Sequence, residues 1–188
     1  MKIVLARHGK SKIEDYKKTS PRGFGDWIRH YDNTGIDTTH APTEKIIFEA
    51  KQTEFVVCSN LKRSLESASL IGIEVVDLEC SGFREAGMPY GNWNILRMTP
   101  KAWSVIFRVM WLLGYSSNTE SFKEAKTRSK ECAKKLMALA ERHSSVLLVG
   151  HGIMNRLIAK ELISLGWQGP PSPGKKYWEF GVYEYATD

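Results

Sequence analysis

The chain has 188 residues, of which 42% are hydrophobic and 26% are charged. This length and composition are typical of a single globular domain over residues 1–188, and they exclude an intrinsically disordered chain, which would be less hydrophobic and more charged. The net charge of +6 favours anionic partners, because a positive surface potential concentrates anions near the protein.

Cysteine usage and the apolar segments predict a cytoplasmic protein. The three cysteines have neither close pairing nor metal-ligand spacing, and their odd number argues against a disulfide framework. The apolar run over residues 3–6 ends at Arg7 and is too short for a signal peptide. The longest apolar stretch, residues 103–115, contains Arg108 and is shorter than the roughly 20 residues that span a bilayer. We therefore expect no membrane partner.

The first elements in chain order are two strands separated by a long irregular stretch. Residues 3–6 form an apolar run bounded by charge, which predicts a buried strand. Residues 9–45 are rich in Gly, Ser, Thr, Asp and Pro, which favours a long excursion with one short helix. A second strand is expected over 54–58.

A helix over 61–71 is expected next, because Ser59 or Asn60 can accept hydrogen bonds from its free N-terminal amides. Arg63 then lies in the first turn, where free amides and the helix dipole favour an anion. Strands that alternate with helices indicate a three-layer α/β/α sandwich with a mostly parallel sheet. The remaining predicted elements are a strand over 73–77, helices over 100–113 and 121–142, a strand over 146–149, a helix over 153–165 and a strand over 178–185.

Two histidines follow two of these strands, each beside glycine. Arg7-His8-Gly9 ends the first strand, and Gly150-His151-Gly152 ends the strand over 146–149. Ligands of α/β sheets bind at the carboxyl ends of strands, and glycine lets backbone amides approach a ligand closely. With the guanidinium of Arg63 nearby, these segments predict an anion site.

Four blocks in a fixed order resemble the histidine phosphatase superfamily, which includes the cofactor-dependent phosphoglycerate mutases. They cover most of the chain, and the resemblance implies a phosphoglycerate mutase-like fold. It also implies a metal-independent, cofactor-free phosphatase that forms a phosphohistidine. The blocks are Arg7-His8-Gly9-Lys10-Ser11, Ser59-Asn60-Leu61-Lys62-Arg63-Ser64 with Ala68, Glu120-Ser121, and Val149-Gly150-His151-Gly152.

The resemblance assigns a role to each residue of the predicted site. His8 is the implied nucleophile, and the guanidiniums of Arg7 and Arg63 neutralise phosphate oxygens in the transition state. His151 is the implied hydrogen-bond donor to the transferring group, in a form that is protonated while phosphate is bound. Gly9 and Gly152 complete the expected phosphate-binding set.

Glu85 is the best match to the family's proton donor, which follows the third strand and protonates the leaving alkoxide. Two features depart from the family pattern. The Gly-x-Trp element that commonly follows the acid lies further along here, as Gly91-Asn92-Trp93, and Arg84 is an alternative surface partner for Glu85. Glu14 occupies the position of a phosphate-binding asparagine, and a carboxylate beside phosphate would repel it.

The apolar segment over residues 103–113 has two interpretations. It is either a helix packed in the core or against a second copy of the chain, which we favour, or a hydrophobic wall that accepts an apolar leaving group. Ser11, Trp27 and Tyr31 are candidates for the substrate cleft.

Other functions remain as alternatives to hydrolysis of a small phosphorylated metabolite. A phosphoglycerate mutase would interconvert isomers with little phosphate release, and by comparison with mutases of the superfamily the chain is short for one. A protein phosphohistidine phosphatase would not need Glu85, because imidazole leaves easily. A non-catalytic module would bind phosphate without turnover. No nucleic-acid-binding motif and no cluster with metal-ligand spacing is evident.

Overall fold

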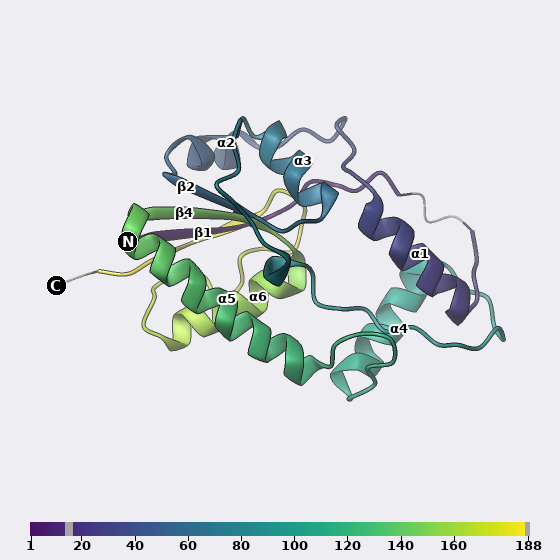
Figure 1. The fold of residues 1–188 in the computed structure, drawn as a ribbon. Coiled ribbons are helices and arrows are strands. Elements are labelled where there is room, and N and C mark those ends of the chain that lie inside the picture. The colour runs from purple at the N-terminus through teal and green to yellow at the C-terminus, as the bar shows by residue number, and fades with distance from the viewer. Residues whose placement is uncertain (14–16, 187–188) are drawn as a thin grey trace.

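The computed structural model describes residues 1–13 and 17–186, and its centre is a five-stranded sheet (Figure 1). The strand order is β3-β2-β4-β1-β5. Strands β1 to β4 run parallel, and β5 pairs antiparallel with β1 at one edge. The strands are β1 (Lys2–Arg7), β2 (Phe55–Cys58), β3 (Leu78–Glu79), β4 (Ser145–Gly150) and β5 (Phe180–Glu184).

Helices cover both faces of the sheet, which confirms the three-layer α/β/α sandwich. Because side chains alternate along a strand, Ile3 and Leu5 of β1 pack on one face while Val4 and Ala6 pack on the other. The first core includes residues of α5 and α6, and the second includes residues of α2 and α3. These helices are α2 (Glu44–Lys51), α3 (Lys62–Leu70), α5 (Phe122–His143) and α6 (Gly152–Ser164).

Two further helices, α1 (Pro21–Asn33) and α4 (Pro100–Leu112), pack against each other beyond the carboxyl ends of the strands (Figure 1). Phe24 of α1 stacks on Phe107 of α4 with ring centroids 5.7 Å apart, and both are fully buried. Their core, which also contains Trp103, is separate from the two cores of the sandwich. We call α1, α4 and this core the outer lobe.

The third strand lies later in the chain than the sequence predicts. Residues 73–77 are β-branched and acidic, but Val75 is exposed and the ladder forms only from Leu78, which pairs with Val57. Asp77, just before the strand, is already bonded to β2: its amide donates to the Val56 carbonyl at 3.0 Å and its carboxylate accepts from the Val56 amide at 2.7 Å. A one-turn helix, Ser81–Phe83, follows β3.

Two helices between β1 and β2 differ from the sequence prediction. Helix α1 is a full 13-residue helix, begun by Pro21 and capped by Ser20, whose hydroxyl accepts from the Gly23 amide. Helix α2 was not predicted, although the Thr43 hydroxyl caps it. None of the helices in the described ranges is long and apolar enough to cross a membrane.

Candidate active site

The sheet register brings the two predicted histidines together. Arg7 on β1 pairs with Gly150 on β4, so His8 and His151 leave adjacent parallel strands at the same edge. Their ring centroids lie 5.0 Å apart, and both side chains are almost fully buried. The predicted juxtaposition is therefore present.

Hydrogen bonds fix the orientation of each imidazole. Nδ1 of His8 lies 2.7 Å from the Gly9 carbonyl oxygen, which can only accept, so this nitrogen is the donor and Nε2 of the neutral ring carries the lone pair. Nε2 of His151 lies 2.6 Å from the Ser59 hydroxyl. Its Nδ1 is buried and has no partner within residues 1–13 and 17–186. One nitrogen of each ring is therefore available to a ligand.

Burial lowers the pKa of both histidines. For His8 the pKa falls to about 3, because desolvation and the charges of Arg63 and Arg7 disfavour the imidazolium more than the hydrogen bond to Gly9 favours it. For His151, desolvation, His8 and the same two guanidiniums hold the pKa well below its ordinary value. Both rings are therefore neutral at pH 7, as a nucleophilic imidazole requires.

Arg63 lies in the first turn of α3 and is held by the end of α1. Its guanidinium donates to the Tyr31 carbonyl and to a carboxylate oxygen of Asp32, both at 3.1 Å, and it lies 4.3 Å from the centre of the Tyr31 ring. Its Nε has no partner among the described residues, although the side chain is only 1% exposed. Asp32 and Tyr31 thus fix one side of the guanidinium and leave Nε for another acceptor.

Arg7 ends β1 immediately before His8 and lies under a tyrosine. It donates to the Lys175 carbonyl and its Cζ lies 4.5 Å from the centre of the Tyr177 ring. Tyr177 also lies 5.8 Å from the His8 ring. The segment before β5 therefore covers this end of the site, a contact that no local sequence signal indicates.

The two glycines have different roles. The Gly9 amide donates to the Ser67 hydroxyl at 2.8 Å, so the structure contradicts its expected use as a free phosphate-binding amide. Glycine is required there because a Cβ would lie 2.3 Å from the Trp178 ring. Gly152, in contrast, is the first residue of α6 and lies against Arg7, where a helix N-terminus favours an anion.

Glu85 contacts the same helix N-terminus. Its Oε1 accepts from the amides of Ile153 and Met154, each at 3.0 Å, and from its neighbour Ala86 at 2.9 Å. Oε2 accepts only from Ile153, at 3.2 Å. Within the described ranges Arg84 forms no ion pair with Glu85, so the alternative of a surface pair was wrong. Glu85 is instead attached to the helix that follows His151.

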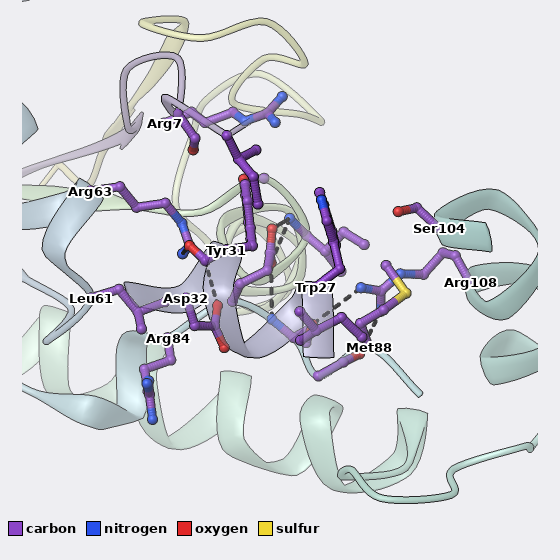
Figure 2. A pocket seen from close by; sticks show the side chains of 18 of the residues that line it. Arg7, Trp27, Tyr31, Asp32, Leu61, Arg63, Arg84, Met88, Ser104 and Arg108 are labelled. Carbon is purple, nitrogen blue, oxygen red and sulfur yellow. Dashed lines mark hydrogen bonds and ion pairs between the residues drawn. The ribbon is translucent and has the colours of Figure 1, made fainter. Parts of the chain in front are cut away.

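A cavity of about 1110 Å³ runs from Arg7 and Arg63 to the outer lobe, and Glu85 lines it (Figure 2). His8 and His151 are buried and do not line it. The three cleft candidates Ser11, Trp27 and Tyr31 all line it. In the part of the chain that is described, no three His, Cys, Asp or Glu side chains group closely enough to hold a metal ion.

Glu14, the Glu120-Ser121 block and Ser59 were also singled out in the sequence. Glu14, the expected source of repulsion, lies outside the described residues. Both residues of the Glu120-Ser121 block make contacts within the fold. Ser121 caps α5 in a capping box. Glu120 pairs with Arg128 and accepts a hydrogen bond from the Gly87 amide at 3.0 Å. Ser59, expected as a helix cap, accepts from the Leu61 amide at 3.3 Å and also contacts His151.

Comparisons with known proteins agree with this geometry. The model of the histidine phosphatase superfamily (branch 1) matches residues 3–186. No curated protein matches the chain.

Several solved structures share the fold at low identity. A mycobacterial glucosyl-3-phosphoglycerate phosphatase is 18% identical, with a TM-score of 0.63 over 96% of this chain and 88% of that one. The product of an open reading frame of Mycobacterium tuberculosis is 19% identical, with a TM-score of 0.62 over 98% and 91%. A putative alpha-ribazole-5'-P phosphatase from Escherichia coli K-12 is 19% identical, with a TM-score of 0.56 over 87% and 80%.

Proposed function

The chain belongs to the histidine phosphatase superfamily, and from that premise we propose that it hydrolyses small phosphate monoesters through a phosphohistidine on His8. The observation that carries the proposal is the grouping of two neutral, buried imidazoles with two guanidiniums that each have an unpartnered Nε among the described residues. Such a site suits a tetrahedral dianion, because fixed donors can neutralise its oxygens without reorganisation.

In the first step, Nε2 of His8 attacks phosphorus and the bond from phosphorus to the leaving oxygen breaks. Arg7 and Arg63 bind the equatorial oxygens, and the Gly152 amide at the start of α6 adds a favourable dipole. Nδ1 of His8 keeps its hydrogen bond to the Gly9 carbonyl, which holds the ring in the attacking tautomer as its charge rises.

Glu85 supplies the proton that the leaving oxygen needs. Because Oε1 already accepts from three amides, Oε2 is the oxygen that carries the proton toward the cavity. In the second step Glu85 accepts a proton from water, the water oxygen attacks phosphorus, and the bond between nitrogen and phosphorus breaks. Inorganic phosphate leaves, and His8 returns to its neutral form.

Access to His8 requires a side chain to move. Only 2% of His8 is exposed, and Tyr177 is the cavity residue whose ring packs beside it. Tyr177 is 37% exposed, so its ring can swing toward solvent. In this proposal the phosphate replaces Tyr177 over Arg7.

The test is a screen of phosphorylated metabolites and phosphopeptides for phosphate release. The wild type is compared with His8→Ala and with His30→Ala, a matched substitution of an exposed histidine on α1. We expect at least one ester to be hydrolysed by the wild type and His30→Ala, with about 10³-fold less activity in His8→Ala. Isomer formation without phosphate release would indicate a mutase, and phosphate binding without turnover a non-catalytic module.

A further inference from the structure

Helix α4 presents three kinds of apolar side chain. Trp103, Phe107 and Trp111 are buried, so the interpretation of a core helix holds for this face. Val105 and Val109, one turn apart, line the cavity and are 61% and 52% exposed. A third group, Ile106 and Leu112 with Leu113 just after the helix, is exposed but does not line the cavity.

The open valines face other apolar side chains across the cavity. Trp27 and Ile28 of α1 and Met88 of the loop after Glu85 line the same space. In Figure 2, Trp27 and Met88 lie between Arg63 and the α4 side chains Ser104 and Arg108. Apolar side chains from α1, α4 and the loop after Glu85 thus contribute to the end of the cavity away from the guanidiniums.

The polar side chains at this end are largely engaged by the protein. Arg108 donates to the carbonyls of Gly87 and Ala86, at 2.9 and 3.2 Å, and lies over the Trp111 ring. The Ser104 hydroxyl donates to the Pro100 carbonyl at 2.9 Å. Lys101 is exposed at the start of α4. Of the polar side chains that α4 contributes to the cavity, Lys101 is therefore the one left to bind a polar leaving group.

We propose, on the basis of the proposed function, that the substrate is a phosphate monoester with a bulky apolar leaving group that lies between α1 and α4. The phosphate would bind at Arg7 and Arg63, and the ring or chain would cover Val105, Val109, Trp27 and Met88. A single cavity holds both ends, and its volume exceeds the space that a phosphate alone needs.

A small ligand explains these valines better than a second copy of the chain. The exposed apolar residues outside the cavity, Ile106, Leu112 and Leu113, are the ones that a protein surface could reach. Val105 and Val109 lie in the same concave space as the catalytic arginines, so an occupant that covers them also reaches the site. That continuity identifies the leaving group as the occupant.

The experiment compares three esters with similar phenol leaving groups: phenyl, 4-cyclohexylphenyl and 4-(carboxymethyl)phenyl phosphate. We expect kcat/KM of the wild type to be about tenfold higher for the cyclohexylphenyl ester than for phenyl phosphate, because added apolar groups in a fitting pocket contribute tenfold or more. Val105→Asn and Val109→Asn should reduce this preference to about threefold or less. Ile106→Asn, a matched β-branched residue outside the cavity, should keep it.

Three results would overturn the proposal: no preference for the cyclohexyl ester, a preference for the carboxymethyl ester, or the same loss of preference in Ile106→Asn as in the valine variants. If no ester is hydrolysed, the proposed function fails separately. In that case the affinities of the same esters for His8→Ala are measured by calorimetry. Tighter binding of the cyclohexylphenyl ester than of phenyl phosphate supports the apolar wall, and equal affinities refute it.

Discussion

The two ends of the cavity are built in different ways. At the sheet, His8, His151 and Arg63 are buried and fixed by hydrogen bonds to backbone and side-chain groups. At the outer lobe, Val105 and Val109 are open, and their helix is positioned by aromatic packing on α1. The sheet end is thus pre-organised for one chemical group, whereas the outer lobe can change its side chains without disturbing the strands.

This difference suggests a test: substitutions at the sheet should change the reaction rate, and substitutions at the outer lobe should change the choice of substrate. One series of aromatic contacts joins the two regions. Trp27 stacks on Phe24 and on Tyr31, with ring centroids 5.6 and 5.2 Å apart, and Tyr31 in turn lies against Arg63. This aromatic series connects the core of the outer lobe to the end of the cavity that holds Arg63. Substitutions at either end should therefore affect different kinetic quantities.

The largest effect is expected at the sheet end, from Glu85→Gln. We expect kcat/KM for alkyl phosphates to fall about 10²- to 10⁴-fold, because an alkoxide needs a proton to leave. For a nitrophenyl ester the loss should be small. Gln retains an oxygen that can accept from the α6 amides, so Tm should change little.

Glu74→Gln, an exposed carboxylate before β3, is the control for this variant. Equal losses on both esters would remove Glu85 from the acid role and leave it as a contact to α6. The alternative of a protein phosphohistidine phosphatase would then gain support.

A smaller effect on kcat/KM is expected at the outer lobe, from Phe107→Ala, together with a loss of stability. Removal of this buried ring should lower the free energy of unfolding by about 3 to 5 kcal/mol and displace Val105 and Val109. Leu136→Ala, on the buried face of α5, should lower the free energy of unfolding by about 2 to 5 kcal/mol, and Leu136 does not line the cavity. Urea unfolding measures both losses.

The ratio of kcat/KM for the cyclohexylphenyl and phenyl esters then separates the two regions. We expect this ratio to fall in Phe107→Ala and to stay unchanged in Leu136→Ala. If Phe107→Ala does not fold, Phe107→Leu provides the same comparison with a smaller cavity. If the ratio falls equally in Phe107→Ala and Leu136→Ala, the loss of preference reflects lower stability and not the position of the outer lobe.

The smallest effect is the dependence of stability on pH between 7.5 and 5. The pKa of His8 is about 3 in the folded state, below the roughly 6.5 of an unfolded histidine, so between these values the unfolded chain binds more protons. The free energy of unfolding should therefore fall as the pH decreases below about 6.5, by up to about 1.4 kcal/mol per unit for each buried histidine. The decrease should continue toward pH 3.

Urea unfolding between pH 7.5 and 5 tests this prediction in a range where few carboxylates titrate. His8→Gln should have a shallower slope than the wild type, and His30→Gln, on the surface of α1, should keep the wild-type slope. Identical slopes in all three proteins would mean that His8 is not buried in its neutral form.

Much of the sheet could be predicted from sequence, because the strands that carry the site are short apolar runs with strong local signals. The runs at 3–6 and 146–149 and the residues that follow them lie as expected. β3 could not be located, since Val75 and Val76 are β-branched yet lie before the strand, which begins at Leu78. Pairing with β2, rather than residue type, decides where that strand begins.

The site was predictable where a motif marks it and not where tertiary contacts complete it. Asp32 and Tyr177 belong to no motif, and they reach Arg63 and Arg7 only because α1 and the segment before β5 fold back over the strand ends. The attachment of Glu85 to α6 joins residues 68 and 69 positions apart. Spacing along the chain carries no information on such contacts.

The most direct test of the account is to trap the phosphorylated enzyme. The wild type and His8→Ala are incubated with a labelled phosphate ester that the screen identifies as a substrate, and the reaction is quenched in alkali. We predict label on residue 8 that is stable in alkali and lost in acid, and none in His8→Ala. Phosphate release by the wild type without any such label would contradict the covalent mechanism.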